Sequence, residues 1–85
     1  MSYFIYILEC SDKTLYTGIT TDLDRRLEEH NNSTKGAKYT KLRRPVKLVY
    51  SEESENRSSA SKREYAIKKL SRVEKLALIK AQVLC

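Results

Sequence analysis

The pattern of hydrophobic and polar positions predicts three strands along the chain. Residues 3–10 form a continuous apolar and aromatic run, which is typical of a buried strand. Turn-forming residues at 11–13 separate this run from a second predicted strand at 14–19, so the two should form a β-hairpin. A further apolar run, VKLVY at 46–50, predicts the third strand.

Helical patterns fill the intervals between and after these strands. We predict three helices, at about 21–30, 58–70 and 71–84. Thr20 or Thr21 offers an N-cap for the first helix, and Asn31-Asn32 should end it. Ser71 and Glu74 have the spacing of a capping box at the start of the last helix.

Two polar connections complete the predicted order ββαβαα. Residues 31–45 read as a basic loop with Gly36 inside it, and residues 51–59 as a polar connector. The chain length fits a single domain over residues 1–85, of mixed α/β (α+β) class, in which helices cover a small sheet.

The excess of basic residues is unevenly distributed. Seventeen Lys and Arg stand against eleven Asp and Glu, and residues 31–51 hold no acid. The bases of that stretch are Lys35, Lys38, Lys41, Arg43, Arg44 and Lys47. Together with Tyr39 they suit phosphate contact and base stacking, although a merely solvated surface would have the same composition.

Other features exclude several classes of protein. No apolar run approaches the roughly 20 residues of a membrane span, and the N-terminus lacks the pattern of a signal peptide. Cys10 and Cys85 stand outside any metal-binding spacing and read as isolated thiols. We therefore expect a cytoplasmic protein, without membrane contact and monomeric.

The first helix presents a cation on its inner face. Leu23, Arg26, Leu27 and His30 lie on one helix face, and the two leucines should point at the sheet. Arg26 and His30 then border the buried side. Arg26 either extends to the rim or pairs with an acid, or it meets an anionic ligand.

The predicted hairpin gives Gly18 a use. A three-residue loop pairs Cys10 with Thr14, which places Tyr6 opposite Gly18 and puts Tyr6 and Tyr16 on one face. A four-residue loop would put the tyrosines on opposite faces. With the shorter loop, the missing side chain should leave a hollow for a substrate backbone beside both phenols. The alternative is that both tyrosines are ordinary strand aromatics.

Glu64 interrupts the apolar face of the helix at 58–70. It lies between Ala60 and Ile67 on that face. It could complete a capping box with Ser61, pair with Lys68, or bind a hard metal ion such as Mg²⁺.

These residues together resemble the GIY-YIG nuclease domain. FIYIL, LYTGIT, DLDRRLEEHN and KREYAIKKLSR follow one another in the order of that family, and the resemblance covers nearly the whole chain. It is closest to the small single-domain bacterial members, which often carry YTGIT, a basic GAKYT loop and REYxIKKLSR. Phe4 and Thr17 depart from the two family motifs, but neither weighs heavily against activity.

The resemblance implies a fold and an activity. The fold would be a three-stranded antiparallel sheet flanked by three helices. The activity would be metal-dependent endonuclease cleavage of DNA, or of RNA, with one Mg²⁺ or Mn²⁺ ion. Such an enzyme would be structure-selective or weakly specific and would act in repair or recombination. The alternatives are a non-catalytic nucleic-acid-binding module and a subunit that needs a larger repair complex.

The resemblance also assigns roles. The implied catalytic residues are Tyr6, Tyr16, Arg26, His30 and Glu64, with Gly18 beside them. Glu64 would be the metal ligand, Arg26 would stabilise phosphate charge, and Tyr16 would position or deprotonate the attacking water. A free tyrosine has a pKa of about 10, so Arg26, the metal and a protonated His30 are candidates to favour the phenolate. Nucleic acid would be gripped by Lys35, Lys38, Tyr39, Lys41, Arg43 and Arg44.

Overall fold

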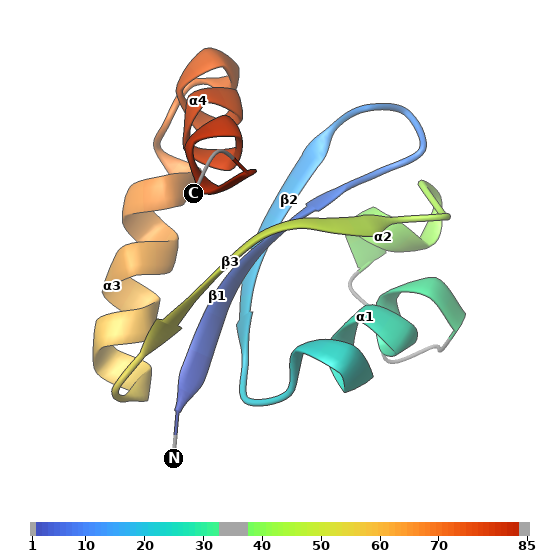
Figure 1. The fold of residues 1–85 in the computed structure, drawn as a ribbon. Helices are drawn as coiled ribbons and strands as arrows, with labels where there is room; N and C mark the ends of the chain where they lie inside the picture. The colour runs from blue at the N-terminus through green and yellow to red at the C-terminus, as the bar shows by residue number, and fades with distance from the viewer. Residues whose placement is uncertain (1, 33–37, 84–85) are drawn as a thin grey trace.

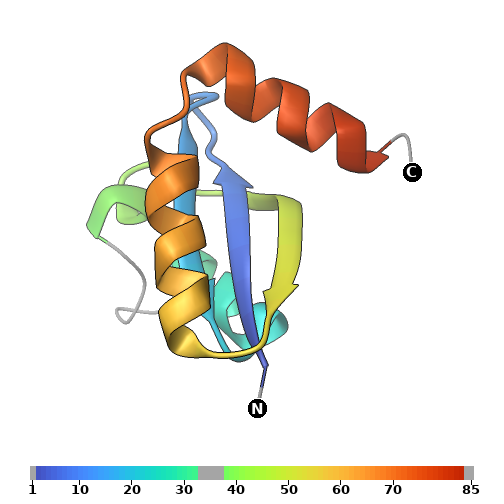
Figure 2. The ribbon, with the colours of Figure 1, turned by 90° about the vertical axis from the view of Figure 1, so that its left-hand side faces the viewer.

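The computed structural model describes residues 2–32 and 38–83, which form an antiparallel sheet with helices on both sides (Figure 1). The strands are β1 (Tyr3–Glu9), β2 (Leu15–Thr20) and β3 (Lys47–Ser54), in the sheet order β2-β1-β3. The helices are α1 (Leu23–Asn32), α2 (Lys38–Lys41), α3 (Arg57–Lys68) and α4 (Arg72–Val83). Helix α3 runs along the strands, and α4 turns away from it (Figure 2).

The predicted three-stranded sheet with flanking helices is confirmed, with two differences. Strand β3 continues through Ser54, where the sequence predicted a polar connector. The extension forms because β1 supplies backbone partners as far as Tyr3, which lies opposite Ser54. The predicted loop at 31–45 contains the short helix α2, whose Thr40 is fully buried. Lys35, Gly36 and Cys85 lie outside the described residues.

The β1–β2 hairpin has the three-residue loop on which the predicted register depended. The Cys10 amide donates to the Thr14 carbonyl at 2.9 Å, and Lys13 adopts a left-handed conformation with φ of 71°. The Asp12 carboxylate accepts hydrogen bonds from the backbone and hydroxyl of Thr14 and stabilises the turn. As predicted, Tyr6 pairs with Gly18.

The two faces of the sheet carry separate hydrophobic clusters. Ile5 and Ile7 of β1 pack with buried residues of β3 and α3 on one face. Tyr6 and Leu8 lie on the other face, toward α1 and the start of β3. Because successive strand residues point to opposite faces, the candidate tyrosine Tyr6 belongs to the α1 side.

Local side-chain caps start the helices. Asp22 caps α1 because its Oδ1 accepts the Arg25 amide at 3.0 Å, so the prediction of a threonine cap was wrong. At the start of α4, Ser71 and Glu74 exchange the two hydrogen bonds of a capping box, as predicted.

Helix α3 begins at Arg57, one residue before the predicted start. Its cap is Asn56, whose side chain accepts the Ser59 amide at 2.9 Å. Ser61 therefore lies inside the helix, and the alternative of a Ser61–Glu64 capping box was wrong. The Glu64 carboxylate is left available for contacts outside the backbone of its own helix.

Gly18 lies directly beneath the ring of Tyr6. A Cβ added at Gly18 would stand 2.5 Å from the Tyr6 hydroxyl oxygen and 2.7 Å from Cζ, which are overlapping distances. The sequence predicted that this position leaves a hollow for a substrate backbone. That expectation was wrong, because the phenol of Tyr6 fills the space.

We expect Gly18→Ala to displace the Tyr6 ring and to lower the free energy of unfolding by about 1–3 kcal/mol. Urea denaturation measures the change. The same substitution in a Tyr6→Ala background should be neutral or slightly stabilising, since alanine suits a strand better than glycine. An equal cost in both backgrounds would contradict a steric role for Tyr6.

Candidate active site

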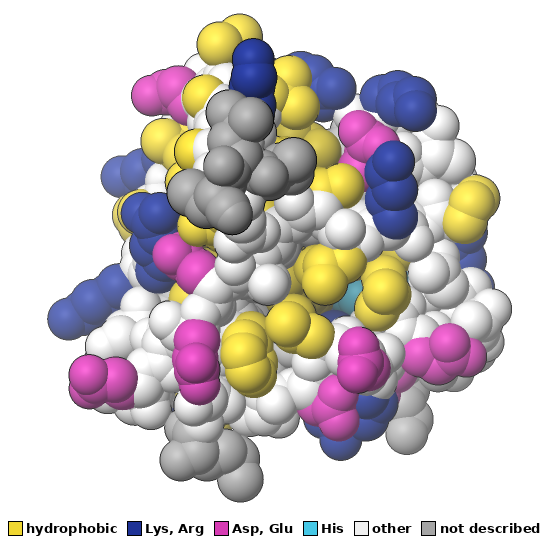
Figure 3. All heavy atoms as spheres, viewed as in Figure 1, with side chains coloured by type: hydrophobic (Ala, Val, Ile, Leu, Met, Phe, Trp, Pro, Cys, Tyr) yellow, Lys and Arg dark blue, Asp and Glu magenta, His cyan; other side chains and the backbone are white. Residues whose placement is uncertain are grey.

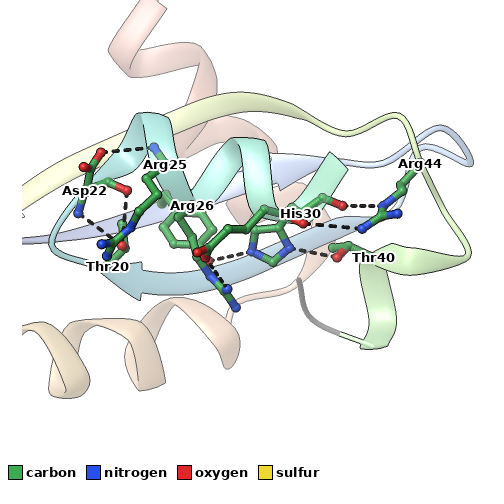
Figure 4. A network of polar contacts seen from close by, with 9 residues as sticks. Thr20, Asp22, Arg25, Arg26, His30, Thr40 and Arg44 are labelled. Atoms are coloured by element: carbon green, nitrogen blue, oxygen red, sulfur yellow. Dashed lines mark hydrogen bonds and ion pairs between the residues drawn. The ribbon is translucent and has the colours of Figure 1, made fainter. Parts of the chain in front are cut away.

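The hydroxyl of Tyr6 lies at the centre of a buried polar network. Tyr6 is 2% exposed, and its hydroxyl oxygen lies 2.9 Å from Nε2 of His30, which is itself fully buried. Nδ1 of His30 lies 2.8 Å from Oγ1 of Thr40 (Figure 4). In the space-filling view, the histidine shows only as a small area between hydrophobic side chains, in keeping with its burial (Figure 3).

His30 is held in its neutral form. The pKa of His30 is lowered from 6.5 to about 4, mainly by burial and also by the positive charges of Arg26 and Arg44, against an opposing effect of Glu29. The sequence-based suggestion that a protonated His30 favours a phenolate was therefore wrong. At neutral pH the ring acts only through hydrogen bonds.

Tyr6 is likewise uncharged. The pKa of Tyr6 is raised from 10.0 to about 12, mainly by burial and to a smaller extent by the neighbouring Tyr16 and Glu64. A hydrogen bond from Arg26 and the charge of that guanidinium act in the opposite direction without reversing the shift. Tyr6 therefore remains a protonated phenol and is not a general base at rest.

Arg26 contacts both the network and an acid of its own helix. Its Nη1 lies 2.9 Å from Oε1 of Glu29, and the guanidinium also hydrogen-bonds to Tyr6. Burial opposes the charge, but the hydrogen bonds to Glu29 and Tyr6 outweigh it and raise the pKa of Arg26. The expected position at the border of the buried side is confirmed, and the side chain remains partly exposed.

Tyr16 joins this network through its ring. The Tyr16 ring centroid lies 6.4 Å from that of Tyr6 and 5.2 Å from that of His30. It also stacks on Tyr39 of α2, with the centroids 5.9 Å apart. Residues from β1, β2, α1 and α2 thus meet in one contiguous aromatic cluster.

Glu64 approaches from the other side of the sheet. It lies on α3, which packs against β1 and β2, and its charge acts on the Tyr6 hydroxyl. Its carboxylate lies 3.4 Å from Nζ of Lys68, and its side chain is 23% exposed. The predicted ion pair with Lys68 is therefore present, beside the proximity to Tyr6.

A single carboxylate decides what kind of metal site this can be. In the described parts of the chain, no three His, Cys, Asp or Glu side chains gather to hold an ion. Mg²⁺ often keeps several waters and takes one or two carboxylates together with phosphate oxygens. Glu64 therefore fits a hydrated cation shared with a phosphate substrate, and does not fit a structural metal site.

Some of the basic residues are exposed to solvent, and others are held by contacts within the protein. Lys38 and Lys41 are exposed on α2. Arg43 pairs with Asp12 at 3.1 Å and lies 4.0 Å over the ring of Tyr39.

Arg44 holds the end of α1. Its Nε donates to the His30 carbonyl at 2.6 Å, and Nη2 donates to the Glu29 carbonyl at 3.4 Å (Figure 4). These carbonyls belong to the last turns of α1, where backbone acceptors lack helical partners. Arg44 thus has a structural task that the basic-loop interpretation did not foresee.

Two further members of the network were missed. The i, i+3 spacing from Arg26 could have indicated Glu29. Thr40 gave no signal, because a buried threonine on a one-turn helix cannot be told from a loop residue by pattern.

The described part of the chain contains no helix long and apolar enough to span a membrane.

Comparison with known proteins agrees with this geometry. Residues 2–77 match the model of the GIY-YIG catalytic domain, so the chain belongs to the GIY-YIG family, a nuclease superfamily. A UPF0213 protein of Desulfotalea psychrophila is 61% identical over 80 residues, which cover 94% of this chain and 73% of that protein. A UPF0213 protein of Staphylococcus aureus is 57% identical over 79 residues, covering 93% and 95%.

Two solution NMR structures have the same fold. A UPF0213 protein of Bacillus halodurans superimposes with a TM-score of 0.61 at 46% identity, over 95% of this chain and 85% of that chain. A protein of E. faecalis gives a TM-score of 0.68 at 47% identity, over 100% and 90%. The family resemblance drawn from the sequence is confirmed.

The neutral state of His30 predicts acid-induced destabilisation. The unfolded chain binds a proton at this residue below about pH 6.5, whereas the folded chain does so only near pH 4. Acidification through this window therefore favours unfolding, and between about pH 7.5 and 4.5 the loss should be about 2–3 kcal/mol. Urea denaturation at the two pH values measures it. The His30→Gln protein has no titrating side chain at this position, so its free energy of unfolding should fall by about 2–3 kcal/mol less than that of the unaltered protein. An equal loss in both proteins would contradict the assignment.

Proposed function

We propose that this protein is an endonuclease that hydrolyses phosphodiester bonds of DNA with the help of one divalent cation, Mg²⁺ or Mn²⁺. The observation that supports it most strongly is that four side chains converge on the Tyr6 hydroxyl. Arg26 and His30 form hydrogen bonds with it, and Tyr16 and Glu64 act on it electrostatically. A guanidinium, phenols and a single carboxylate at one partly exposed place can stabilise phosphate charge, position water and bind a metal ion, which are functions that phosphodiester hydrolysis uses.

Each side chain has a role in this proposal. Glu64 would hold the cation, which supplies Lewis-acid polarisation of a phosphate oxygen when bound. Arg26 remains charged and stabilises the negative charge that grows on the phosphate in the transition state. Tyr16 is partly exposed and positions the attacking water, while the buried pair of Tyr6 and His30 orients Arg26.

The nucleic acid would bind along α2. Lys38 and Lys41 are exposed there, and Tyr39 lies between them against Tyr16. The formal net charge of +6 favours attraction to a polyanion. Since phosphate contacts carry no sequence information, we infer weak or structure-dependent specificity. RNA is the second substrate to be tested.

The proposal extends to the cellular setting. Cys10 is a buried free thiol, as expected in a reducing compartment, which supports a cytoplasmic location. Repair or recombination of DNA is the process in which a nuclease of weak sequence specificity fits. We propose that it acts as a monomer, alone or within a larger repair complex.

We expect Glu64→Gln to lower the rate of Mg²⁺-dependent cleavage by at least about 10²-fold while leaving DNA affinity and thermal stability nearly unchanged. Cleavage of single-stranded, nicked, flapped and branched DNA in Mg²⁺ or Mn²⁺ is the measurement. Lys68→Met is the matched control, because it breaks the Glu64–Lys68 ion pair and keeps the carboxylate.

The outcomes separate the alternatives. Equal loss of rate in Glu64→Gln and Lys68→Met would reduce Glu64 to an ion-pair role. Binding without cleavage on every substrate by the unaltered protein would indicate a non-catalytic binding module. Cleavage that appears only after a partner is added would indicate a subunit of a repair complex.

We also expect Lys38→Glu with Lys41→Glu to weaken DNA binding and to flatten its salt dependence, by about 0.9 in logarithmic slope for each lost phosphate contact on duplex DNA. Fluorescence anisotropy over a range of salt concentrations measures the slope. Arg72→Glu with Lys80→Glu makes the same charge change at exposed positions of α4. Equal effects of the two double variants would show that net charge, and not α2, determines affinity.

A further inference from the structure

Thr40, His30 and Tyr6 form a buried chain of hydrogen bonds that ends at Arg26. Thr40 and His30 have no exposed surface, and Tyr6 is 2% exposed. The contacts are 2.8 Å from Thr40 Oγ1 to His30 Nδ1 and 2.9 Å from His30 Nε2 to the Tyr6 oxygen. The Tyr6 oxygen in turn hydrogen-bonds to the guanidinium of Arg26. Each link therefore limits the direction in which the next can donate.

The direction of the chain follows from counting donors. An arginine can only donate, so the Tyr6 oxygen accepts from Arg26. If His30 carried its proton on Nε2, two donors would point at this one oxygen and the phenolic proton would need a third partner in a buried place. If Nε2 is bare, the Tyr6 hydroxyl donates to it and still accepts from Arg26. The second arrangement satisfies every group.

That arrangement puts the imidazole proton on Nδ1, facing Thr40. A hydroxyl can accept one hydrogen bond and donate another, so Thr40 accepts the Nδ1 proton while its own hydroxyl proton serves a further contact. A buried N–H without such an acceptor would be costly. The side chain opposite Nδ1 thus selects the tautomer of His30.

We propose that Thr40 is a positioning residue, which holds His30 as the Nδ1–H tautomer and thereby aims the Tyr6 hydroxyl at Nε2 and its oxygen at Arg26. The position of the guanidinium, and so its fit to a phosphate, depends on a residue that touches neither. The consequence for cleavage rests on the proposed nuclease function, whereas the tautomer does not.

The tautomer can be measured directly because His30 is the one histidine of the chain. Long-range proton–nitrogen NMR correlation of the full-length, ¹⁵N-labelled protein at neutral pH distinguishes the protonated ring nitrogen from the bare one. We expect the Nδ1–H tautomer in the unaltered protein and in Thr40→Ser. In Thr40→Val, which replaces the hydroxyl by a methyl group of similar size, we expect a shift toward the Nε2–H tautomer. Thr21→Val, at an exposed position, is the control and should leave the spectrum unchanged.

Two results would overturn the proposal. One is an Nε2–H tautomer in the unaltered protein, a measurement that needs no variant to fold. The other is a folded Thr40→Val protein with the same tautomer as the unaltered one.

Cleavage kinetics provide the second readout. We expect kcat of Thr40→Val to fall by about 10-fold, by analogy with the lower end of what the loss of an outer-shell partner costs at a metal-bound histidine. KM should stay unchanged, and Thr40→Ser should restore kcat. A rise in KM with an unchanged kcat would assign Thr40 to substrate binding and contradict the positioning role. If the unaltered protein cleaves no nucleic acid, the proposed function fails, and the tautomer measurement still decides the role of Thr40.

Discussion

The Tyr6 ring can occupy its buried place because position 18 of β2 carries no side chain. A methyl group there would overlap the hydroxyl and the ring carbon that bears it. With the ring in this place, the hydroxyl reaches Nε2 of His30 and meets the guanidinium of Arg26. A glycine in a strand interior costs conformational entropy. Here it determines where the Tyr6 phenol lies, and the contacts of that phenol with His30 and Arg26 depend on this placement.

Burial then divides the site into neutral and charged parts. Tyr6 and His30 are removed from water, and their pKa values shift in the directions that keep both uncharged at neutral pH. Arg26 and Glu64 keep contact with solvent and with a partner of opposite charge. The neutral pair is therefore suited to orientation, and the charged pair to phosphate and metal. Because both groups are buried and uncharged, Tyr6 is not suited to act as a general base and His30 is not suited to act as a cation.

The sequence predicted the three strands and, for a three-residue turn, the register of the hairpin, because both follow from local rules. The three residues between Cys10 and Thr14 determine the hairpin pairing, and that pairing places Tyr6 opposite Gly18. What it could not predict depends on contacts between distant segments. The polar stretch from Ser51 to Ser54 extends β3 because β1 lies beside it. Thr40 is buried where it contacts His30 of α1. A helix of four residues is too short for its periodicity to predict this burial.

The short helix α2 joins the two halves of the proposed function. Its exposed Lys38 and Lys41 can meet phosphates, its Tyr39 stacks on Tyr16, and its buried Thr40 contacts His30. Four consecutive residues therefore touch the solvent, the aromatic cluster and the buried hydrogen-bonded chain. Under the proposed function, the helix that would contact phosphates is therefore the same helix that supplies the buried hydrogen-bond partner of His30.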